Sequence, residues 1–323
     1  MHVGILYSVG HSRFNKNMIE IRNLSHQYGK IKALQNINLK IEAGKITSFL
    51  GPNGSGKSTL FKILATLLKP TSGEIHFFQT ALLKDPHTIR RSIGVVFQSP
   101  SLDKKLTVFE NMIHQGHLYG LSGTALSQKV KVLLEEFGVA QRQSSVVETL
   151  SGGLKRRVEI AKALLHDPKV LLFDEPGAGL DPGVRQDIWR FMKKLQREKQ
   201  VTCLVTTHLM DEADQSDDVA ILDEGHLIAY DTPYTLKQEI GGDVVHFTST
   251  NLNLLKQNVE QTFKYPCEIL GGELRLEIAH GEDVLPQLVK AFPTLIETAK
   301  LSKPTLEDVF MKRTGHGLRG ERT

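Results

Sequence analysis

A glycine-rich segment between a short apolar run and a helical pattern constrains this chain more than any other feature. Residues 51–59 read Gly-Pro-Asn-Gly-Ser-Gly-Lys-Ser-Thr and fit the pattern G-x-x-x-x-G-K-[ST]. The apolar run Ile46 to Leu50 precedes it, and a helical stretch, Lys57 to Leu68, follows it. Strand, turn and helix in this order let successive backbone N–H groups converge on phosphate oxygens at a helix N-terminus. The segment therefore predicts a binding site for the phosphates of a nucleotide.

A second segment supplies the carboxylates that such a site needs, because a glycine-rich turn before a helix also occurs as an ordinary loop. Lys169 to Glu175 reads Lys-Val-Leu-Leu-Phe-Asp-Glu, a continuous apolar run typical of a buried parallel strand. Its carboxyl end is where parallel sheets present ligands. Lys57 is placed to reach the β- and γ-phosphates and Ser58 to ligate Mg²⁺. Asp174 is expected to support that ion, and Glu175 to polarise an attacking water.

Composition limits the kind of protein and its partners. With 323 residues, 40% of them hydrophobic, the chain is long enough for one large domain and a smaller one. A net charge of +4, with basic residues scattered along the chain, does not call for a nucleic-acid partner. The only cysteines, Cys203 and Cys267, suggest no disulfide framework and favour a reducing, cytosolic compartment. No run approaches the roughly 18 apolar residues that span a bilayer, so any membrane role requires a partner.

Hydrophobic patterning predicts an α/β fold with several parts. Residues 18–240 form the predicted nucleotide-binding domain, with an antiparallel β subdomain over 19–48, a helical insert over 107–165, and a parallel-sheet core. Gly241-Gly242 marks a predicted boundary, followed by a small α/β accessory domain over 241–316 and a tail over 317–323. Residues 1–17 look unrelated to the fold, and we hypothesise that translation starts at Met18.

Further motifs, taken with the phosphate segment, identify a family resemblance. Residues 150–157 read Leu-Ser-Gly-Gly-Leu-Lys-Arg-Arg shortly before the Asp174–Glu175 pair, Gln98 follows an apolar run, and His208 follows another. In this order and spacing they resemble the nucleotide-binding subunit of ATP-binding cassette transporters, over about residues 19 to 235. The resemblance implies a P-loop NTPase cassette, ATP and Mg²⁺ as cofactors, and hydrolysis of ATP.

Carried over residue by residue, the resemblance implies a role for each motif. Tyr28 would stack on adenine, and Glu175 would act as the catalytic base. Gln98 would ligate Mg²⁺ together with Ser58, while His208 would contact the γ-phosphate. The residues implied to hold the phosphates are Gly51, Pro52, Asn53, Gly54, Ser55, Gly56, Lys57, Ser58 and Thr59.

Another group of motifs implies that two subunits share each active site. Ser151, Gly152 and Gly153 would bind the γ-phosphate of ATP held by the opposite subunit, since Ser151 opens a helix whose N-terminal amides favour an anion. Asp181, in Gly-Leu-Asp, resembles the loop that couples the two sites. A complete set of motifs makes a homodimer the simpler expectation.

Ordinary explanations exist for several of these residues. Tyr28 also reads as a half-buried aromatic, Gln98 as a polar loop residue, and His208 as a histidine at a strand end. We interpret Arg156 and Arg157 as a solvated or interfacial face, because a run of charges is usually no more than that.

Finer features resemble the bacterial drug, polyketide and nodulation-factor exporter group, typified by daunorubicin-resistance ATPases. The tail Pro304 to Phe310 is similar to a segment with which that group often ends. Two departures stand out: Gly177 where the family usually has Thr, and Leu154 where it commonly has Gln. A glycine at 177 is expected to loosen the loop that leads to Asp181.

Three functions of different kinds follow. The first is an ATPase that energises a separate integral membrane permease for export of a drug, polyketide, lipid or glycan, at the cytoplasmic face of the bacterial inner membrane. The second is an importer ATPase with a regulatory C-terminal domain. The third is a non-transport cassette acting on ribosomes, although this chain shows neither a second cassette nor a long coiled coil.

Overall fold

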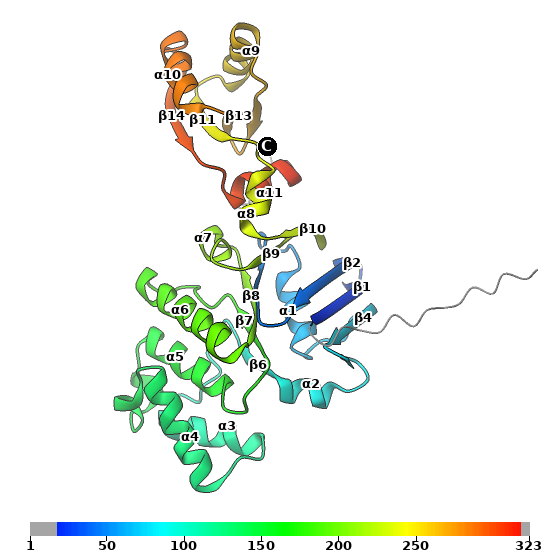
Figure 1. The fold of residues 1–323 in the computed structure, drawn as a ribbon, viewed down its shortest axis with the longest axis vertical. Helices are drawn as coiled ribbons and strands as arrows, with labels where there is room; N and C mark the ends of the chain where they lie inside the picture. Colours follow the sequence, from blue (N-terminus) through cyan, green and yellow to red (C-terminus); the bar gives the residue numbers. More distant parts are fainter. Residues whose placement is uncertain (1–17, 318–323) are drawn as a thin grey trace, which may run out of the picture.

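The computed structural model describes residues 18–317, which form three β-sheets and the helices that cover them (Figure 1). The predicted extension over 1–17, with the hypothesis that translation starts at Met18, and residues 318–323 of the predicted tail lie outside this range.

The first sheet is antiparallel, as predicted for the N-terminal region. Its strand order is β2-β1-β4-β5. Isoleucines on alternate positions of β1, Ile19 and Ile21, are buried, which gives this strand one core face. The sheet extends beyond the predicted range, because its strands are β1 (Met18–Tyr28), β2 (Ile31–Glu42), β4 (Ser72–Phe77) and β5 (Thr80–Ala81).

The second sheet is the predicted parallel core, with strand order β10-β9-β3-β8-β7-β6. All neighbouring pairs are parallel except the hairpin of β9 and β10. The strands are β3 (Ile46–Leu50), β6 (Ile93–Val96), β7 (Val170–Asp174), β8 (Thr202–Thr207), β9 (Asp218–Asp223) and β10 (His226–Asp231). Helices α1 (Lys57–Leu64) and α6 (Pro182–Lys199) connect and flank them.

Helix α1 ends four residues before the predicted Leu68. Thr66 takes a left-handed conformation with φ 62°, and the Leu67 amide turns back to the Lys62 carbonyl at 2.8 Å. This arrangement satisfies carbonyls of the last turn and stops the helix.

The predicted helical insert lies at one end of the molecule (Figure 1). Buried side chains such as Met112, Val130 and Phe137 form one core with Phe173 of β7, so the insert packs directly on the parallel sheet. Its helices are α3 (Val108–Leu118), α4 (Gly123–Glu136) and α5 (Gly152–Ala163), and α2 (Pro86–Ser92) precedes β6.

The C-terminal region forms a third sheet at the other end of the molecule, with order β12-β13-β11-β14 (Figure 1). Four of the seven positions of β14 are exposed, so the apolar signal of this strand in the sequence is weak. The elements are β11 (Asp243–Ser249), α9 (Leu252–Phe263), β12 (Glu268–Leu270), β13 (Glu273–Ile278), α10 (Gly281–Ala291) and β14 (Ile296–Ser302).

The last helix, α11 (Leu306–Thr314), connects this region to the cassette. It begins at a capping box of Thr305 and Asp308. Phe310 is fully buried in a cluster that contains Leu236 of α8 (Pro233–Gln238) and Ile221 of the parallel sheet. The helix therefore packs on the cassette as well as on the third sheet.

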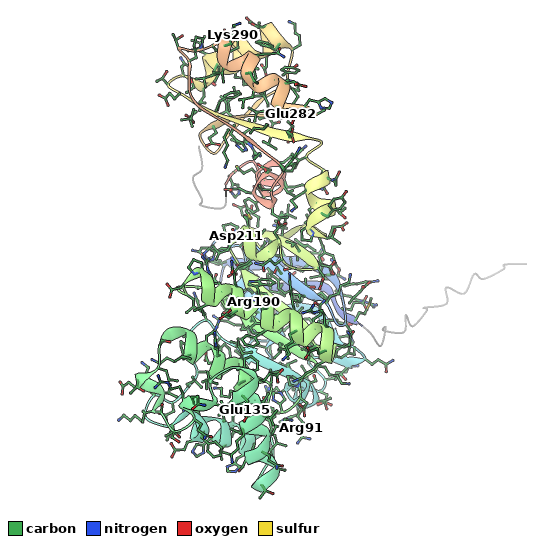
Figure 2. All side chains as sticks on the ribbon, turned by 60° about the vertical axis from the view of Figure 1, so that its left-hand side comes forward. Arg91, Glu135, Arg190, Asp211, Glu282 and Lys290 are labelled. Atoms are coloured by element: carbon green, nitrogen blue, oxygen red, sulfur yellow. The ribbon has the colours of Figure 1, made fainter. Side chains whose placement is uncertain are left out.

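Charged side chains of both signs are spread over the length of the molecule. Arg91 and Glu135 lie at one end and Glu282 and Lys290 at the other (Figure 2). In the described part of the chain, no helix is both long and apolar enough to cross a membrane.

Candidate nucleotide and catalytic site

The predicted site residues converge because of the sheet topology. Strands β3, β8, β7 and β6 are neighbours and run parallel, so their carboxyl ends lie along one edge. The phosphate loop follows β3, Gln98 follows β6, Asp174 and Glu175 end β7, and His208 follows β8. Four segments separated in sequence thus meet at a single edge.

The phosphate loop is closed around the ammonium of Lys57. Lys57 is 4% exposed, and its Nζ donates to the carbonyls of Gly51 at 2.7 Å and Pro52 at 2.8 Å. Burial lowers the pKa of Lys57, an effect that the nearby carboxylates of Glu175 and Asp174 oppose. The lysine is therefore held as a fixed donor beside the loop.

Three features of the loop and of the helix that follows it fit a bound phosphate. Gly56 has φ 103°, and a Cβ there would lie 2.6 Å from the Ala33 carbonyl oxygen, so only glycine allows this path. The Ser55 hydroxyl is buried and has no hydrogen-bond partner within residues 18–317. Helix α1 has no acidic residue in its first turn. A glycine-lined loop, a buried donor without a partner and a free helix N-terminus form a set that fits an anion.

Asp174 lies beside this loop with one carboxylate oxygen engaged. Thr206 Oγ1 donates to Asp174 Oδ1 at 2.6 Å. Burial raises the pKa of Asp174, and the hydrogen bond from Thr206 opposes the shift. Ser58, on the first turn of α1, is exposed. A carboxylate and a hydroxyl are oxygen ligands of the type that Mg²⁺ takes, so the donor set fits this ion.

Gln98 and His208 both contact the predicted catalytic base, Glu175. Gln98 Nε2 donates to Glu175 Oε2 at 3.1 Å, and His208 Nδ1 lies 3.3 Å from Glu175 Oε1. The backbone of Glu175 takes φ 43°, a left-handed conformation that is costly for a non-glycine residue. Its amide donates to Thr206 Oγ1 at 3.0 Å, which helps to hold this conformation. Strain and mutual contact are typical of a functional site.

The signature residues form a separate group. Ser151 caps α5 and accepts from the Leu154 amide at 3.4 Å, with Gly152 and Gly153 in the first turn. A Cβ at Gly153 would lie 3.1 Å from Val184, so this turn packs against the segment that carries the exposed Asp181. Within residues 18–317, no hydrogen bond or ion pair joins this group to Lys57 or Glu175.

Tyr28 stands at the end of β1 with its side chain 45% exposed. Its ring lies edge-on to His26, with the centroids 4.6 Å apart. The side chain is thus partly available at the surface.

Arg156 corrects our interpretation of the charge run in α5. It is 5% exposed rather than solvated, and its guanidinium donates to the Phe97 carbonyl and, at 3.1 Å, to the Pro176 carbonyl. Arg157, its neighbour, is partly exposed and pairs with Asp187 of α6 at 2.5 Å. The prediction was wrong for Arg156 because the side of the helix that faces the core cannot be read from charge alone.

Gly177 lies close against side chains of two other segments, and the expectation that a glycine here loosens the loop stays a prediction. A Cβ at this position would overlap Glu212 Oε1 and approach Arg185 Cδ to 2.9 Å. Glu212 is 4% exposed, accepts from Thr207 Oγ1 at 2.6 Å, and keeps Oε1 without a hydrogen-bond partner within the described range. The carboxyl of Glu212 thus occupies the space that a larger side chain at 177 would need.

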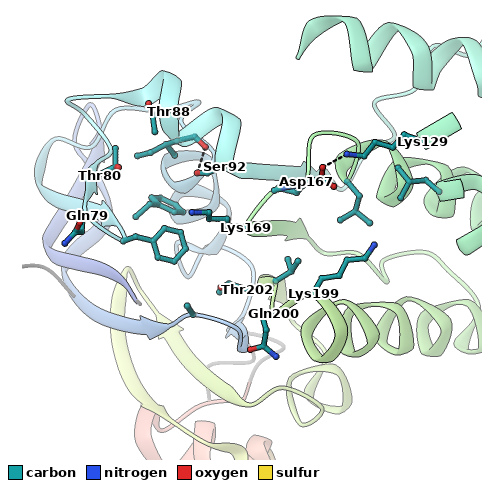
Figure 3. Close-up of a pocket in the computed structure, with 18 of the residues that line it drawn as sticks. Gln79, Thr80, Thr88, Ser92, Lys129, Asp167, Lys169, Lys199, Gln200 and Thr202 are labelled. Carbon is teal, nitrogen blue, oxygen red and sulfur yellow. Dashed lines mark hydrogen bonds and ion pairs between the residues drawn. The ribbon is translucent and has the colours of Figure 1, made fainter. Parts of the chain in front are cut away.

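A cavity of about 920 Å³ lies at the opposite end of the parallel strands. It is lined at the amino ends of β7 and β8 by Lys169 and Thr202, and Lys129 of α4 pairs with Asp167 across its wall (Figure 3). None of the residues that line it in the described chain belongs to the predicted nucleotide site. The site at the carboxyl edge is therefore distinct from this cavity.

Known proteins resemble this chain over most of its length. A family model described as "ABC transporter" matches residues 34–178. The chain is 32% identical over 314 residues to the daunorubicin/doxorubicin resistance ATP-binding protein DrrA of Streptomyces peucetius, with 92% of each chain covered. It is 35% identical over 300 residues to the Nod factor export ATP-binding protein I of Burkholderia lata, covering 92% of this chain and 97% of that one.

Solved structures show the same fold. The cassette cbiO1 of Clostridium perfringens, described as part of the ABC transporter complex cbiONQ, superposes with a TM-score of 0.65 at 30% identity, covering 77% of this chain and 97% of that one. A dimeric post-hydrolysis state of the cassette MJ0796, bound to ADP and Pi, gives a TM-score of 0.61 at 31% identity over 67% of this chain and 98% of that one. The chain therefore belongs to the ABC transporter family, as one of its ATP-binding ATPase subunits.

Proposed function

We propose that the chain energises an ABC-type exporter through a separate integral membrane permease. The observation that carries the proposal is similarity over 92% of the chain to proteins named for drug resistance and Nod factor export. Two copies, each with a complete set of motifs, would form a homodimer at the cytoplasmic face of the bacterial inner membrane. No nucleic-acid partner is expected.

The residues at the carboxyl edge account for hydrolysis of ATP within this proposal. Lys57 and the loop over residues 51–59 bind the phosphates, and Ser58, Gln98 and Asp174 would hold Mg²⁺. The bound ion would neutralise charge that develops on the phosphate oxygens. Glu175 orients and deprotonates the attacking water, and its contacts with Gln98 and His208 aim the carboxylate.

The remaining predicted residues serve binding and communication. Tyr28 stacks on the adenine with its exposed face, as its position at the end of β1 allows. Ser151, Gly152 and Gly153 offer backbone amides to the nucleotide of the other subunit, because a helix N-terminus favours an anion. Asp181 lies beside this turn and relays the state of one site to the other. This division of labour explains why Ser151 makes no contact with Lys57 in the same chain.

An affinity experiment tests the permease. The tagged Glu175→Gln variant is isolated with ATP and Mg²⁺ from detergent-solubilised membranes of its own organism, and its partners are identified by mass spectrometry. Lys57→Ala, which is expected to lose nucleotide binding, serves as the matched control. We expect a polytopic membrane protein in stoichiometric amount with Glu175→Gln and less of it with Lys57→Ala. Ribosomal proteins or nucleic acid in its place would favour the non-transport alternative.

Direction is tested with the isolated complex in proteoliposomes whose cassettes face outward. Fluorescent daunorubicin is the first probe, because a relative is named for resistance to it. An exporter accumulates the probe inside the vesicles when ATP is added outside. ATP-driven release of a preloaded substrate, with no accumulation, would indicate an importer.

A further inference from the structure

Helix α5 carries three charged side chains in its buried face. Arg156, Glu159 and Lys162 are spaced three residues apart, and they are 5%, 1% and 9% exposed. Residues three apart on a helix lie on neighbouring positions of one side. Charges removed from water in this way are retained only when each has partners, so the contacts of these three residues are informative.

These side chains bind both ends of residues 97–101, the segment that contains Gln98. At its start, Arg156 Nη1 donates to the Phe97 carbonyl. At its end, the Ser101 amide donates to Glu159 Oε1 at 2.5 Å, and Lys162 Nζ donates to the Ser101 carbonyl and hydroxyl, both at 2.8 Å. Residues 97–101 lie outside any helix or strand. Their path is therefore set by α5.

Arg156 also donates hydrogen bonds to the backbone on both sides of Glu175. Its Nε donates to the Pro176 carbonyl at 3.1 Å and its Nη2 to the Asp174 carbonyl at 3.4 Å. These two carbonyls flank a residue whose φ of 43° is costly without support. One guanidinium thus contacts the residue before Gln98 and both neighbours of Glu175. The side chains of Gln98 and Glu175 are themselves joined by a hydrogen bond of 3.1 Å.

An ion pair keeps the guanidinium in this orientation. Arg156 Nη1 lies 3.2 Å from Glu159 Oε2, within the same helix. A planar guanidinium with five donors can serve three carbonyls and a carboxylate at once, whereas a lysine ammonium has three donors and no fixed fork. The arrangement therefore depends on arginine in particular.

We propose that Arg156 is a positioning residue for ATP hydrolysis, which holds Gln98 and Glu175 in contact with each other. Glu159 and Lys162 bind the other end of residues 97–101, and we call the three side chains together the clamp. The proposal deepens the proposed function, since it rests on the role given to Glu175. It also means that a shift of α5, the helix that begins after Ser151, moves Gln98 with it.

The test compares Arg156→Met with Arg156→Lys and with the adjacent Arg157→Met. Turnover and KM are measured with Mg-ATP, and Kd with a fluorescent ATP analogue. We expect kcat of Arg156→Met to fall by about tenfold to a hundredfold, because small displacements of catalytic groups have effects of this size. Nucleotide Kd should change by less than about twofold, since Lys57 and its loop are untouched. Arg156→Lys should stay close to Arg156→Met, and Arg157→Met should keep wild-type turnover.

A second variant covers the case in which Arg156→Met fails to fold, because that change removes the ion-pair partner of the buried Glu159 carboxylate. The double variant Arg156→Met/Glu159→Met removes both charges together, which proteins tolerate far better. A normal melting temperature, normal Kd and low kcat would support the clamp. Wild-type kcat in a folded double variant would overturn it.

Glu175→Gln is assayed beside these variants. It tests the role of Glu175 as catalytic base separately from the role of the clamp. Loss of turnover in both Glu175→Gln and Arg156→Met supports the two assignments together. If Glu175→Gln kept its turnover while Arg156→Met lost it, the assigned base would be wrong and the clamp would act on Gln98. Full turnover in Arg156→Met overturns the clamp whatever Glu175→Gln does.

Discussion

The side-chain amide of Gln98 donates a 3.1 Å hydrogen bond to the carboxylate of Glu175. The two residues follow neighbouring parallel strands, β6 and β7, and are 77 positions apart in the sequence. An amide that donates to one carboxylate oxygen while His208 lies 3.3 Å from the other leaves Glu175 few ways to turn. The contact thus aims the group expected to activate water.

Replacing Glu175 by Gln should abolish turnover while sparing nucleotide binding. A neutral amide cannot accept a proton from water. The kcat should therefore fall by about a hundredfold or more, which is the usual contribution of a general base to the rate. Phosphate release gives kcat, and a fluorescent ATP analogue gives Kd. The exposed Glu135→Gln on α4 is the matched control. Undiminished hydrolysis by Glu175→Gln would remove Glu175 as the base.

Gly177→Ala should destabilise the protein, because the added Cβ would overlap the buried carboxyl of Glu212. Overpacking of this kind costs about 1–3 kcal/mol. The matched change is Gly183→Ala in the first turn of α6, where a Cβ would meet nothing within 4 Å. There, alanine should be neutral or stabilise by up to about 1 kcal/mol. Thermal denaturation compares the two, and equal melting temperatures would refute the packing role of Gly177.

Glu212→Gln should stabilise the protein increasingly as the pH rises. Burial raises the pKa of Glu212 above its ordinary value of 4.5. The folded state therefore holds this proton more tightly than the unfolded state, so its contribution to stability is present below pH 4.5 and is lost as the pH rises through the raised pKa. Glutamine cannot ionise and can still accept from Thr207.

Melting temperatures of wild type and Glu212→Gln, measured from acidic to mildly alkaline pH, check this expectation. The difference in favour of the variant should grow as the pH rises above 4.5, the ordinary pKa of the side chain. Exposed Glu135→Gln should show little change over the same range. A difference that stays constant or shrinks with rising pH would show that Glu212 ionises as easily in the folded state as in the unfolded state.

Phe310→Ala should weaken the attachment of α11 to the cassette. The ring is fully buried with Leu236 and Ile221, and truncation of a buried phenylalanine costs about 3–5 kcal/mol. Denaturant titration followed by circular dichroism measures the loss. Glu307→Ala, on the exposed side of the same helix, should stay within about 0.5 kcal/mol of wild type. Equal stability of the two variants would mean that α11 contributes little to the folded cassette.

Local patterns predicted most of the elements, and the failures have physical causes. Helix α9 (Leu252–Phe263) rests on local features, its apolar spacing and its Asn251 cap, which a sequence pattern can express. Strand β14 has no comparable local signal, because it lies mostly exposed and is defined by pairing with β11, more than forty positions away. The division into two domains stays a prediction, with α11 packed on both parts.

The sequence by itself determined the phosphate loop, the carboxylates of β7 and the family. Glycine spacing and the end of an apolar run are local features, so they can be read from the order of residues alone. Only the tertiary structure decided that Gln98, Glu175 and His208 touch, that Glu212 fills the space beside Gly177, and that Arg156 is buried. Each of these depends on which faces of distant segments meet, and hydrophobic burial in three dimensions sets that choice. A charged residue such as Arg156 has no local signal for the carbonyls that it will find.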